Sequence, residues 1–228
     1  AVVQQCANTG AVSAKRSNTG GIAGRMDLGL IISCESYGSV ESDSGSCVGG
    51  IAGLTAATVR SSYAKCTLSG KHYVGGIAGQ NYGSIIQCEN SGSINTTEVD
   101  TELDLDALNR EQLNAAENVP VCTDIGGIAG FSSGILQSCV NTGAVGYAHE
   151  GYNIGGIVGQ QSGYLNGCTN SGMILGRKDV GGITGQLVPE VRLLYTESQV
   201  GDLLDELDVL RDLIGRTNDD ARSASNEI

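Results

Sequence analysis

The chain has 228 residues, a net charge of −12 and an unusual composition, with 35 glycines, two prolines, one phenylalanine and no tryptophan. Glycine does not recur at every third position and the aliphatic content is ordinary, which excludes both a collagen-like and a disordered chain. A nucleic-acid partner is excluded because phosphate binding needs a basic surface. No apolar run is long enough to span a bilayer, so we expect no membrane insertion in this chain.

A five-residue glycine block recurs along the chain. Gly-Gly-Ile-Ala-Gly, or the same block with Val or Thr in fourth place, stands at Gly20–Gly24, Gly49–Gly53, Gly75–Gly79, Gly126–Gly130, Gly155–Gly159 and Gly181–Gly185. Successive first glycines are 29, 26, 51, 29 and 26 residues apart. A fixed period of this length predicts a repeat architecture.

Each repeat has a second half with its own fixed spacing. Nine or ten residues after a block comes a cysteine, followed four residues later by a glycine and then by an aliphatic residue. The chain opens inside such a half. The cysteines are Cys6, Cys34, Cys88, Cys139 and Cys168, and in the second repeat Ser62 takes this place while Cys66 takes that of the glycine.

The repeat unit predicts two short apolar strands separated by Gly, Asn-Thr-Gly or Asn-Ser-Gly turns. One such unit cannot bury its apolar face, whereas stacked units about 4.8 Å apart form a continuous core. Glycine is expected to supply positive φ at the corners and to allow close approach of the chain to itself. We therefore predict an all-β parallel solenoid of about six turns over residues 1–188.

The shared place of five cysteines points to packing rather than to disulfides. Side chains stacked in register point the same way, so we expect these five to be buried, reduced and stacked. Cys47, Cys66 and Cys122 lie off this column and are the residues left for a disulfide. There is no Cys-x-x-Cys pair, so a zinc site is not expected.

The 51-residue interval contains an acidic insertion. Residues 95–120 carry seven acids and one base, lack glycine and end at Pro120. Thr97 or Thr101 is suited to cap a helix here. We predict a helix that projects from an unbroken stack, with the acids on its solvated face.

Residues 189–228 form a second region of different composition, with ten acids and four bases. From Leu193 to Ile228 apolar or small residues alternate at four and three positions, which predicts an amphipathic helix or the start of a coiled coil. We expect Leu193–Ile214 to cover the end of the solenoid within a monomer.

The pattern "VGGIAG…G…IIQCENSGSI", together with "TVRSSYAKCTL" at Thr58–Leu68, resembles the bacterial GLUG-motif repeats. That motif is named for a Gly-Leu-x-Gly core, in which Ile replaces Leu here. The resemblance implies an exported bacterial protein, either a surface adhesin or the non-catalytic part of a secreted metalloprotease. It implies no active-site residues within the repeats.

Three constellations fail as chemical sites. His149-Glu150 begins a zinc-protease-like motif whose second histidine is missing, and His72 belongs to another repeat. An EF-hand-like spacing of acids from Asp100 to Glu111 has Leu105 where a turn glycine is required. The glycine blocks lack the Lys-Ser/Thr of a phosphate-binding loop. We therefore expect no catalytic, cofactor-binding or metal-binding residues and no enzymatic activity.

Two functional hypotheses remain. The first is a non-catalytic structural or adhesive segment of a large bacterial surface or secreted protein, extracellular, which spaces neighbouring domains and offers a host protein or glycan a surface. Residue 1 falls inside a repeat, so we expect the chain to be part of a longer protein.

The second hypothesis is a glycan-binding or glycan-processing solenoid. A groove lined by tyrosine together with two or more acids on one face would favour it. The tyrosines available are Tyr63, Tyr73, Tyr82, Tyr147, Tyr152 and Tyr164, and the acids of the repeats are Asp27, Glu35, Glu41, Asp43, Glu89, Asp124 and Asp179.

Overall fold

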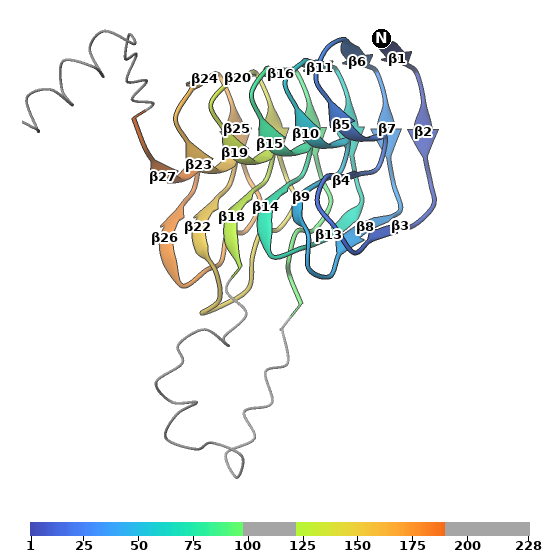
Figure 1. Cartoon of the computed structure of the whole chain (residues 1–228). Helices are drawn as coiled ribbons and strands as arrows, with labels where there is room; N and C mark the ends of the chain where they lie inside the picture. The colour runs from blue at the N-terminus through green and yellow to red at the C-terminus, as the bar shows by residue number, and fades with distance from the viewer. Residues whose placement is uncertain (98–121, 190–228) are drawn as a thin grey trace, which may run out of the picture. The chain divides into compact units, whose positions relative to one another are not determined.

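The computed structural model describes residues 1–97 and 122–189, and within these ranges the chain forms 27 short strands and no helix. The strands make five parallel sheets, which we label A to E, and each turn of the chain adds one strand or bridge to each sheet. Figure 1 shows the strands of a sheet side by side along the stack. The predicted all-β parallel solenoid of about six turns is confirmed.

The sheets follow one another around each turn in the order D, E, A, B, C. Sheet D comprises β4 (Thr19–Gly20), β9 (Ser46–Gly49), β14 (His72–Gly75), β18 (Thr123–Gly126), β22 (Tyr152–Gly155) and β26 (Lys178–Gly181). Sheet E comprises β5 (Ala23–Met26), β10 (Ala52–Thr55), β15 (Ala78–Asn81), β19 (Ala129–Ser132), β23 (Val158–Gln161) and β27 (Thr184–Leu187).

The other three sheets are built from the second half of each repeat. Sheet A comprises β1 (Val2–Gln4), β6 (Leu30–Ile32), β11 (Thr58–Arg60), β16 (Ser84–Ile86), β20 (Ile135–Gln137) and β24 (Tyr164–Asn166). Sheet B comprises β2 (Ala7–Asn8), β7 (Glu35–Ser36), β12 (Tyr63–Ala64), β17 (Glu89–Asn90), β21 (Val140–Asn141) and β25 (Thr169–Asn170). Sheet C comprises β3 (Val12–Ala14), β8 (Ser39–Ser42) and β13 (Thr67–Ser69).

The stack is unbroken across the 51-residue interval. In sheet D, β14 pairs directly with β18, so that Val74 lies opposite Ile125 and Gly75 opposite Gly126. The predicted helix over residues 95–120 is absent at 95–97, and the rest of it lies outside the described residues. The predicted C-terminal helix likewise lies outside them from residue 190 onward.

The first turns have five strands of two to four residues, and the later ones have four strands and a single bridge, rather than the two strands predicted per repeat. The backbone takes a positive φ at two recurring places. One lies just before the cysteine column, where it follows the strand of sheet A and ends it. The other lies inside the strands of sheet D, where Cys47, Tyr73 and Asp124 have φ values of 66°, 54° and 59°. There the pairing passes over the left-handed residue, as at Tyr73 between the paired residues His72 and Val74.

The expectation that glycine supplies the positive φ is wrong at most corners, which carry Asn, Ser, Gln, Asp, Cys, Tyr or His instead. The glycine blocks serve the other purpose named above, close approach. A Cβ on Gly127 would meet the carbonyl of Gly156 and the side chain of Asn141. Gly76 and Gly156 stand in the same relation to Asn90 and Asn170. The second glycine of a block therefore makes room for the asparagine of the Asn-x-Gly turn.

These asparagines form a column of stacked amides inside the solenoid. The Asn90 Nδ2 atom donates to the Asn141 Oδ1 atom at 2.8 Å, and the Asn141 Nδ2 atom donates to the Asn170 Oδ1 atom at 2.8 Å. Each amide also bonds to the glycine two residues on, which closes the turn. Asn90 and Asn141 are fully buried, and satisfied buried amides of this kind fix the register of a stack.

The cysteine column is stacked as predicted, with Ser62 in register between Cys34 and Cys88. All eight cysteines of the chain are free thiols, including Cys47, Cys66 and Cys122. Burial, however, is confirmed only for the interior members of the column. Cys6 is exposed and Cys168 is half-buried, because among the described residues each has a neighbouring turn of sheet B on one side only.

Candidate functional site: a cleft at the corner between sheets C and D

The corner between sheets C and D is where the repeats differ most in length. Gly75 follows Leu68 at an interval of seven residues, Gly155 follows Val145 at ten, and Gly126 follows Ile94 at 32. Sheet C is also the least regular sheet, because beyond β13 it continues only as the single bridges Leu68–Ile94, Ile94–Val145 and Val145–Ile174.

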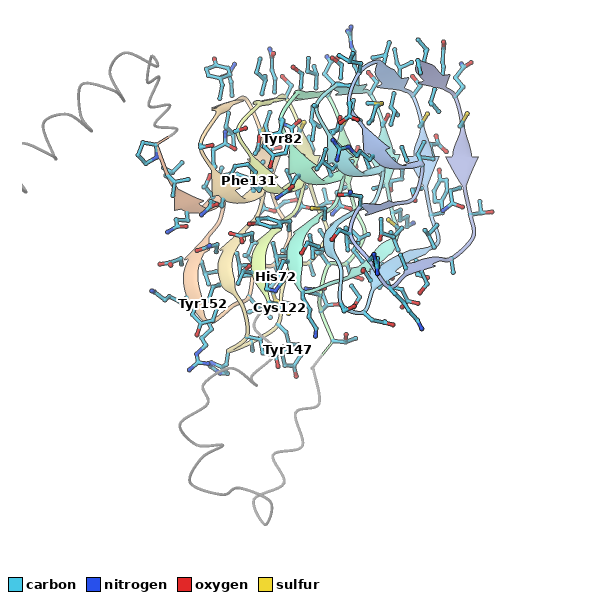
Figure 2. The ribbon with its side chains drawn as sticks, in the orientation of Figure 1. His72, Tyr82, Cys122, Phe131, Tyr147 and Tyr152 are labelled. Carbon is cyan, nitrogen blue, oxygen red and sulfur yellow. The ribbon has the colours of Figure 1, made fainter. Side chains whose placement is uncertain are left out.

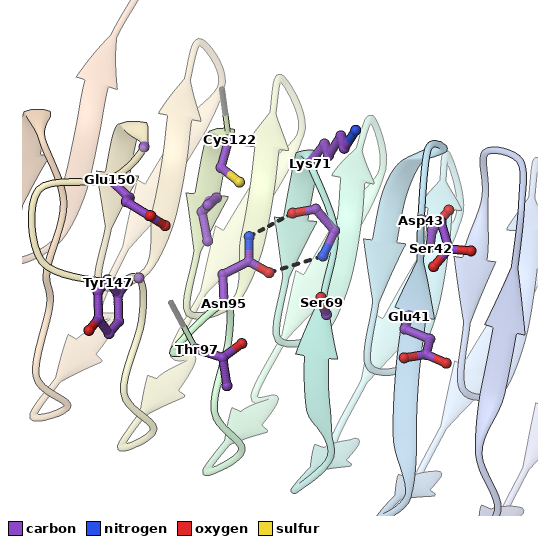
Figure 3. A pocket seen from close by; sticks show the side chains of 14 residues that line it. Glu41, Ser42, Asp43, Ser69, Lys71, Asn95, Thr97, Cys122, Tyr147 and Glu150 are labelled. Carbon is purple, nitrogen blue, oxygen red and sulfur yellow. Dashed lines mark hydrogen bonds between the residues drawn. The ribbon is translucent and has the colours of Figure 1, made fainter. Parts of the chain in front are cut away.

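An open cleft of about 150 Å³ lies at this corner and runs across several turns (Figure 3). Its lining comes from loops and strand residues of successive turns and is rich in polar side chains. The lining residues are Glu41, Ser42, Asp43, Ser69, Gly70, Lys71, Asn95, Thr97, Cys122, Ile125, Gly146, Tyr147, Glu150 and Gly151.

The side chain of Asn95 takes the place of a missing strand in the cleft wall. Its Oδ1 atom accepts a hydrogen bond from the Gly70 amide at 3.0 Å, and its Nδ2 atom donates to the Gly70 carbonyl at 2.6 Å (Figure 3). The Asn95 amide N–H donates to the Leu68 carbonyl at 2.9 Å. These three hydrogen bonds attach Asn95 to Leu68 and Gly70 of the preceding turn.

The cleft has a surplus of negative charge. Glu41 and Asp43 line one part and Glu150 lines another, against the single ammonium of Lys71. Tyr147 adds an aromatic ring on the side of Glu150 (Figure 3). Burial, and then the nearby Glu150 carboxylate, raise the pKa of the Cys122 thiol, so this thiol is a weak nucleophile at neutral pH.

A chain of polar side chains follows sheet D next to the cleft. The Thr123 hydroxyl donates to the Asp124 carboxylate at 2.8 Å, and the Asn153 amide donates to its other oxygen at 2.8 Å. The Nδ1 atom of His72 lies 2.9 Å from the Thr123 hydroxyl oxygen. Asp124 is thus a buried but satisfied carboxylate, which supports the left-handed corner rather than facing a ligand.

The six tyrosines considered for a glycan-binding face lie on different sheets and loops, and Figure 2 labels Tyr82, Tyr147 and Tyr152 among them. Tyr73 and Tyr82 both pack against Phe131 of the next turn, with ring centroids 6.3 and 5.8 Å away. Tyr63 packs against Tyr37 on sheet B at 6.2 Å. Tyr152 belongs to sheet D and Tyr164 is exposed on sheet A. Only Tyr147 of the six lines the cleft.

The acids weighed in the repeats also separate. Glu41 and Asp43 line the cleft, where Glu150 joins them. Asp27 pairs with Arg25 at 2.9 Å on the surface. Of the remaining four, Glu35 accepts from the Tyr37 hydroxyl, Asp179 lies 3.9 Å from Lys178, Asp124 is buried, and Glu89 is exposed on sheet B.

The sequence reasoning did not single out Ser69, Lys71, Asn95 or Thr97 as site residues. The signal that would have found them is the variable distance between the aliphatic residue of sheet C and the next glycine block, since loops of unequal length leave an uneven surface at that corner.

Within residues 1–97 and 122–189 there is no group of three or more His, Cys, Asp or Glu side chains suited to hold a metal ion, so His149 and Glu150 do not meet a third ligand there. The same residues contain no helix long and apolar enough to cross a membrane.

The fold defines the class: a parallel β-solenoid repeat protein with turns of 26 to 29 residues and one insertion. The particular repeat follows from the family comparison, in which the model described as "The GLUG motif" matches residues 70–95. The predicted resemblance to GLUG-motif repeats is thereby confirmed at residues 70–95, and a bacterial origin stays a prediction. The matched stretch is one full turn, whose first and last residues are the hydrogen-bonded Gly70 and Asn95. No curated protein and no solved structure gives a match.

Proposed function

We propose that the chain is a non-catalytic, rigid spacer segment of a larger exported protein, one that holds neighbouring domains apart on a bacterial surface or in a secreted product. The observation that carries this proposal is the unbroken register of the stack. Sheets A, B, D and E each contain six parallel strands, and the amide column ties successive turns together inside. A solenoid in which each turn contacts only its neighbours is suited to span distance.

Export is supported by the GLUG motif, because the resemblance stated from the sequence implies surface or secreted proteins. The surface composition agrees with a spacer. Outward positions of sheet B carry Ala7, Glu35, Tyr63, Glu89, Val140 and Thr169, with no repeated functional residue. The interior positions, by contrast, repeat the same residue types from turn to turn.

The rigidity of the stack can be tested by measuring distances between residues that share one column of sheet B. Spin labels are attached, by chemistry that spares the native thiols, at Glu35 and at Glu89, Val140 or Thr169 of the same column. The separation is expected to grow by about 4.8 Å per turn, with narrow distributions. Broad distributions that do not follow the number of turns would contradict the spacer function.

Glycan binding at the cleft is a second candidate, and one observation favours it. The cleft combines Tyr147 with the carboxylates of Glu41, Asp43 and Glu150, which is the combination that the sequence reasoning required for this alternative. Carboxylates accept hydrogen bonds from sugar hydroxyls, and a tyrosine ring offers an apolar face with a polar edge.

The second candidate is tested by titrating neutral oligosaccharides into the protein and into two variants. Tyr147→Ala is expected to lose binding, whereas Tyr164→Ala, which removes a tyrosine 58% exposed outside the cleft, is expected to retain it. Equal affinity of both variants and the wild type would place the binding elsewhere, and no binding to any member of the series would remove this candidate.

A further inference from the structure

Three aromatic rings meet on the outer side of the solenoid. Phe131 is the outward residue of β19, and Tyr73 and Tyr82 of the preceding turn pack against it. Figure 2 shows Tyr82 and Phe131 beside each other. Tyr82 is 48% exposed, and the other two rings are half-buried. The chain has eight tyrosines, one phenylalanine and no tryptophan, so its scarce aromatic residues are concentrated at this place.

Each of the three rings is the only aromatic residue in its column among the described turns. The outward column of sheet E otherwise contains Arg25, Leu54, Gln80, Gln160 and Gln186. The column of Tyr82 contains Ala56, Ser133, Ser162 and Val188, whose N–H groups bond to the turn before in the same way. The column of Tyr73 contains Cys47, Asp124, Asn153 and Asp179, all with a positive φ. A solenoid repeats the same unit, so the fold itself does not account for three exceptions that meet at one place.

Amide side chains lie on both sides of Phe131 in register. Gln80 is its partner in the turn before, and Gln160 is its partner in the turn after. The Tyr82 hydroxyl donates to the Gln80 Oε1 atom at 3.4 Å, and the Gln160 Nε2 atom donates to the Gln186 Oε1 atom at 2.7 Å. The Gln80 Nε2 atom is thereby left as a donor, and the Gln160 Oε1 atom as an acceptor, next to the aromatic rings.

The surface around the rings is uncharged. From Leu54 to Val188, no charged residue occurs in the column of Phe131 or in that of Tyr82. An extended peptide binds by adding to the edge of a sheet, whereas β19 has a paired strand on each side. A neutral carbohydrate fits this surface better, because its hydroxyl groups both donate and accept hydrogen bonds, as the amides do, and its C–H groups pack against aromatic rings.

We propose that these residues form a binding site for a neutral oligosaccharide on the outer face of sheet E. The sugar packs its C–H groups against Phe131 and Tyr82, and its hydroxyl groups bond to Gln80 and Gln160. The outward residues from Gln80 to Gln186 belong to four successive turns, about 14 Å along the stack, so the site accommodates a chain of sugars. This activity goes beyond the spacer function, and the site is separate from the cleft, which none of these residues lines.

The site is tested by isothermal titration calorimetry with cellohexaose, xylohexaose and mannohexaose, and with hexagalacturonic acid as a charged comparison. Two variants take the residue that the same column has in a neighbouring turn, Phe131→Gln as at Gln160 and Tyr82→Ser as at Ser133, so both are expected to fold. The wild type is expected to bind at least one neutral hexasaccharide, and each variant is expected to bind it about tenfold more weakly.

Two control variants separate this site from other surfaces. Tyr147→Ala changes the cleft, and Tyr164→Ala removes the exposed tyrosine of sheet A. Both are expected to bind the hexasaccharide like the wild type. If Tyr147→Ala loses binding while Phe131→Gln keeps it, the oligosaccharide binds in the cleft and the site on sheet E is wrong.

Three further results would overturn the proposal: no binding of any neutral hexasaccharide, wild-type affinity in folded Phe131→Gln, or tighter binding of hexagalacturonic acid than of the neutral series. If Phe131→Gln does not fold, Gln160→Leu decides. Leu54 already occupies this column, so that variant is expected to fold and, having lost the acceptor, to bind about fivefold more weakly. Unchanged affinity of Gln160→Leu would then contradict the proposal.

Discussion

Replacing Asn141 by alanine removes the middle member of the buried amide column. Its amide group makes three hydrogen bonds, one from Asn90, one to Asn170 and one to the Gly143 carbonyl at 3.0 Å. A hydrogen bond contributes about 0.5–1.5 kcal/mol net. The three together therefore predict a loss of about 3 kcal/mol in the free energy of unfolding.

Asn90 and Asn170 keep other hydrogen bonds in the Asn141→Ala variant, which limits the loss of stability. Asn90 still donates to the Gly92 carbonyl at 3.2 Å, and the Asn170 oxygen still accepts from the Gly172 N–H at 3.1 Å. Alanine is also the residue that the second repeat carries in this column, at Ala64. We therefore expect Asn141→Ala to fold, with a midpoint of thermal unfolding about 6–12 °C lower, at about 2–4 °C per kcal/mol for a chain of this size.

The measurement is thermal and urea unfolding followed by circular dichroism, and the matched control is Asn166→Ala. Asn166 is an asparagine of β24 on the exposed side of sheet A, and surface changes of this kind usually stay within about 0.5 kcal/mol. If Asn141→Ala unfolds within that margin of the wild type, the amide column does not stabilise the stack and the reasoning fails.

Three further predictions concern the interior and the insertion. Gly127→Ala places a Cβ against the carbonyl of the next turn and the buried amide beside it, so we expect a loss of at least about 3 kcal/mol or failure to fold, whereas Gly182→Ala, which meets nothing within 4 Å, should unfold like the wild type. Cys34→Ser should cost less than about 1.5 kcal/mol by urea unfolding, because Ser62 already occupies the same column and donates to a carbonyl at 3.0 Å; a loss above about 3 kcal/mol would contradict equivalence of the two. Replacing residues 97–118 by a short linker should preserve the β-type circular dichroism signal and cooperative unfolding, since the sheets on both sides pair directly; loss of that signal would make the insertion part of the core.

The repeat period and the aliphatic pattern were sufficient to predict the stack, its register and its number of turns. They predicted the register of the atypical second turn as well, where Ser62 and Cys66 replace the usual residues. This success has a simple cause: in a solenoid the same position recurs on the same column, so spacing in sequence translates directly into neighbours in space.

The conformation of the corners could not be predicted in the same way. Residues such as Cys47 and Tyr73 have a positive φ although neither type favours it, because stacking on the neighbouring turns fixes their backbone. Burial of the whole cysteine column was overestimated for a different reason. Periodicity assigns every member of the column the same surroundings, whereas Cys6 and Cys168 have a neighbouring turn on only one side among the described residues.

The cleft was the least predictable part. Glu41 and Asp43 had been noted as acids and Tyr147 as a tyrosine, but the repeat pattern does not describe the loops that bring them to one corner. Their meeting with Glu150 depends on loop paths between sheets C and D, which vary in length from turn to turn.

The corner between sheets C and D has a consequence for how such a protein can change. Intervals of seven, ten and 32 residues are accommodated there while the paired columns on both sides keep their register. Selection can therefore lengthen or replace one loop without retuning the others, and a laboratory library of inserted peptides at this corner would face the same freedom. Because successive loops leave the stack about 4.8 Å apart, peptides grafted into two neighbouring turns would be displayed as a closely spaced, ordered pair.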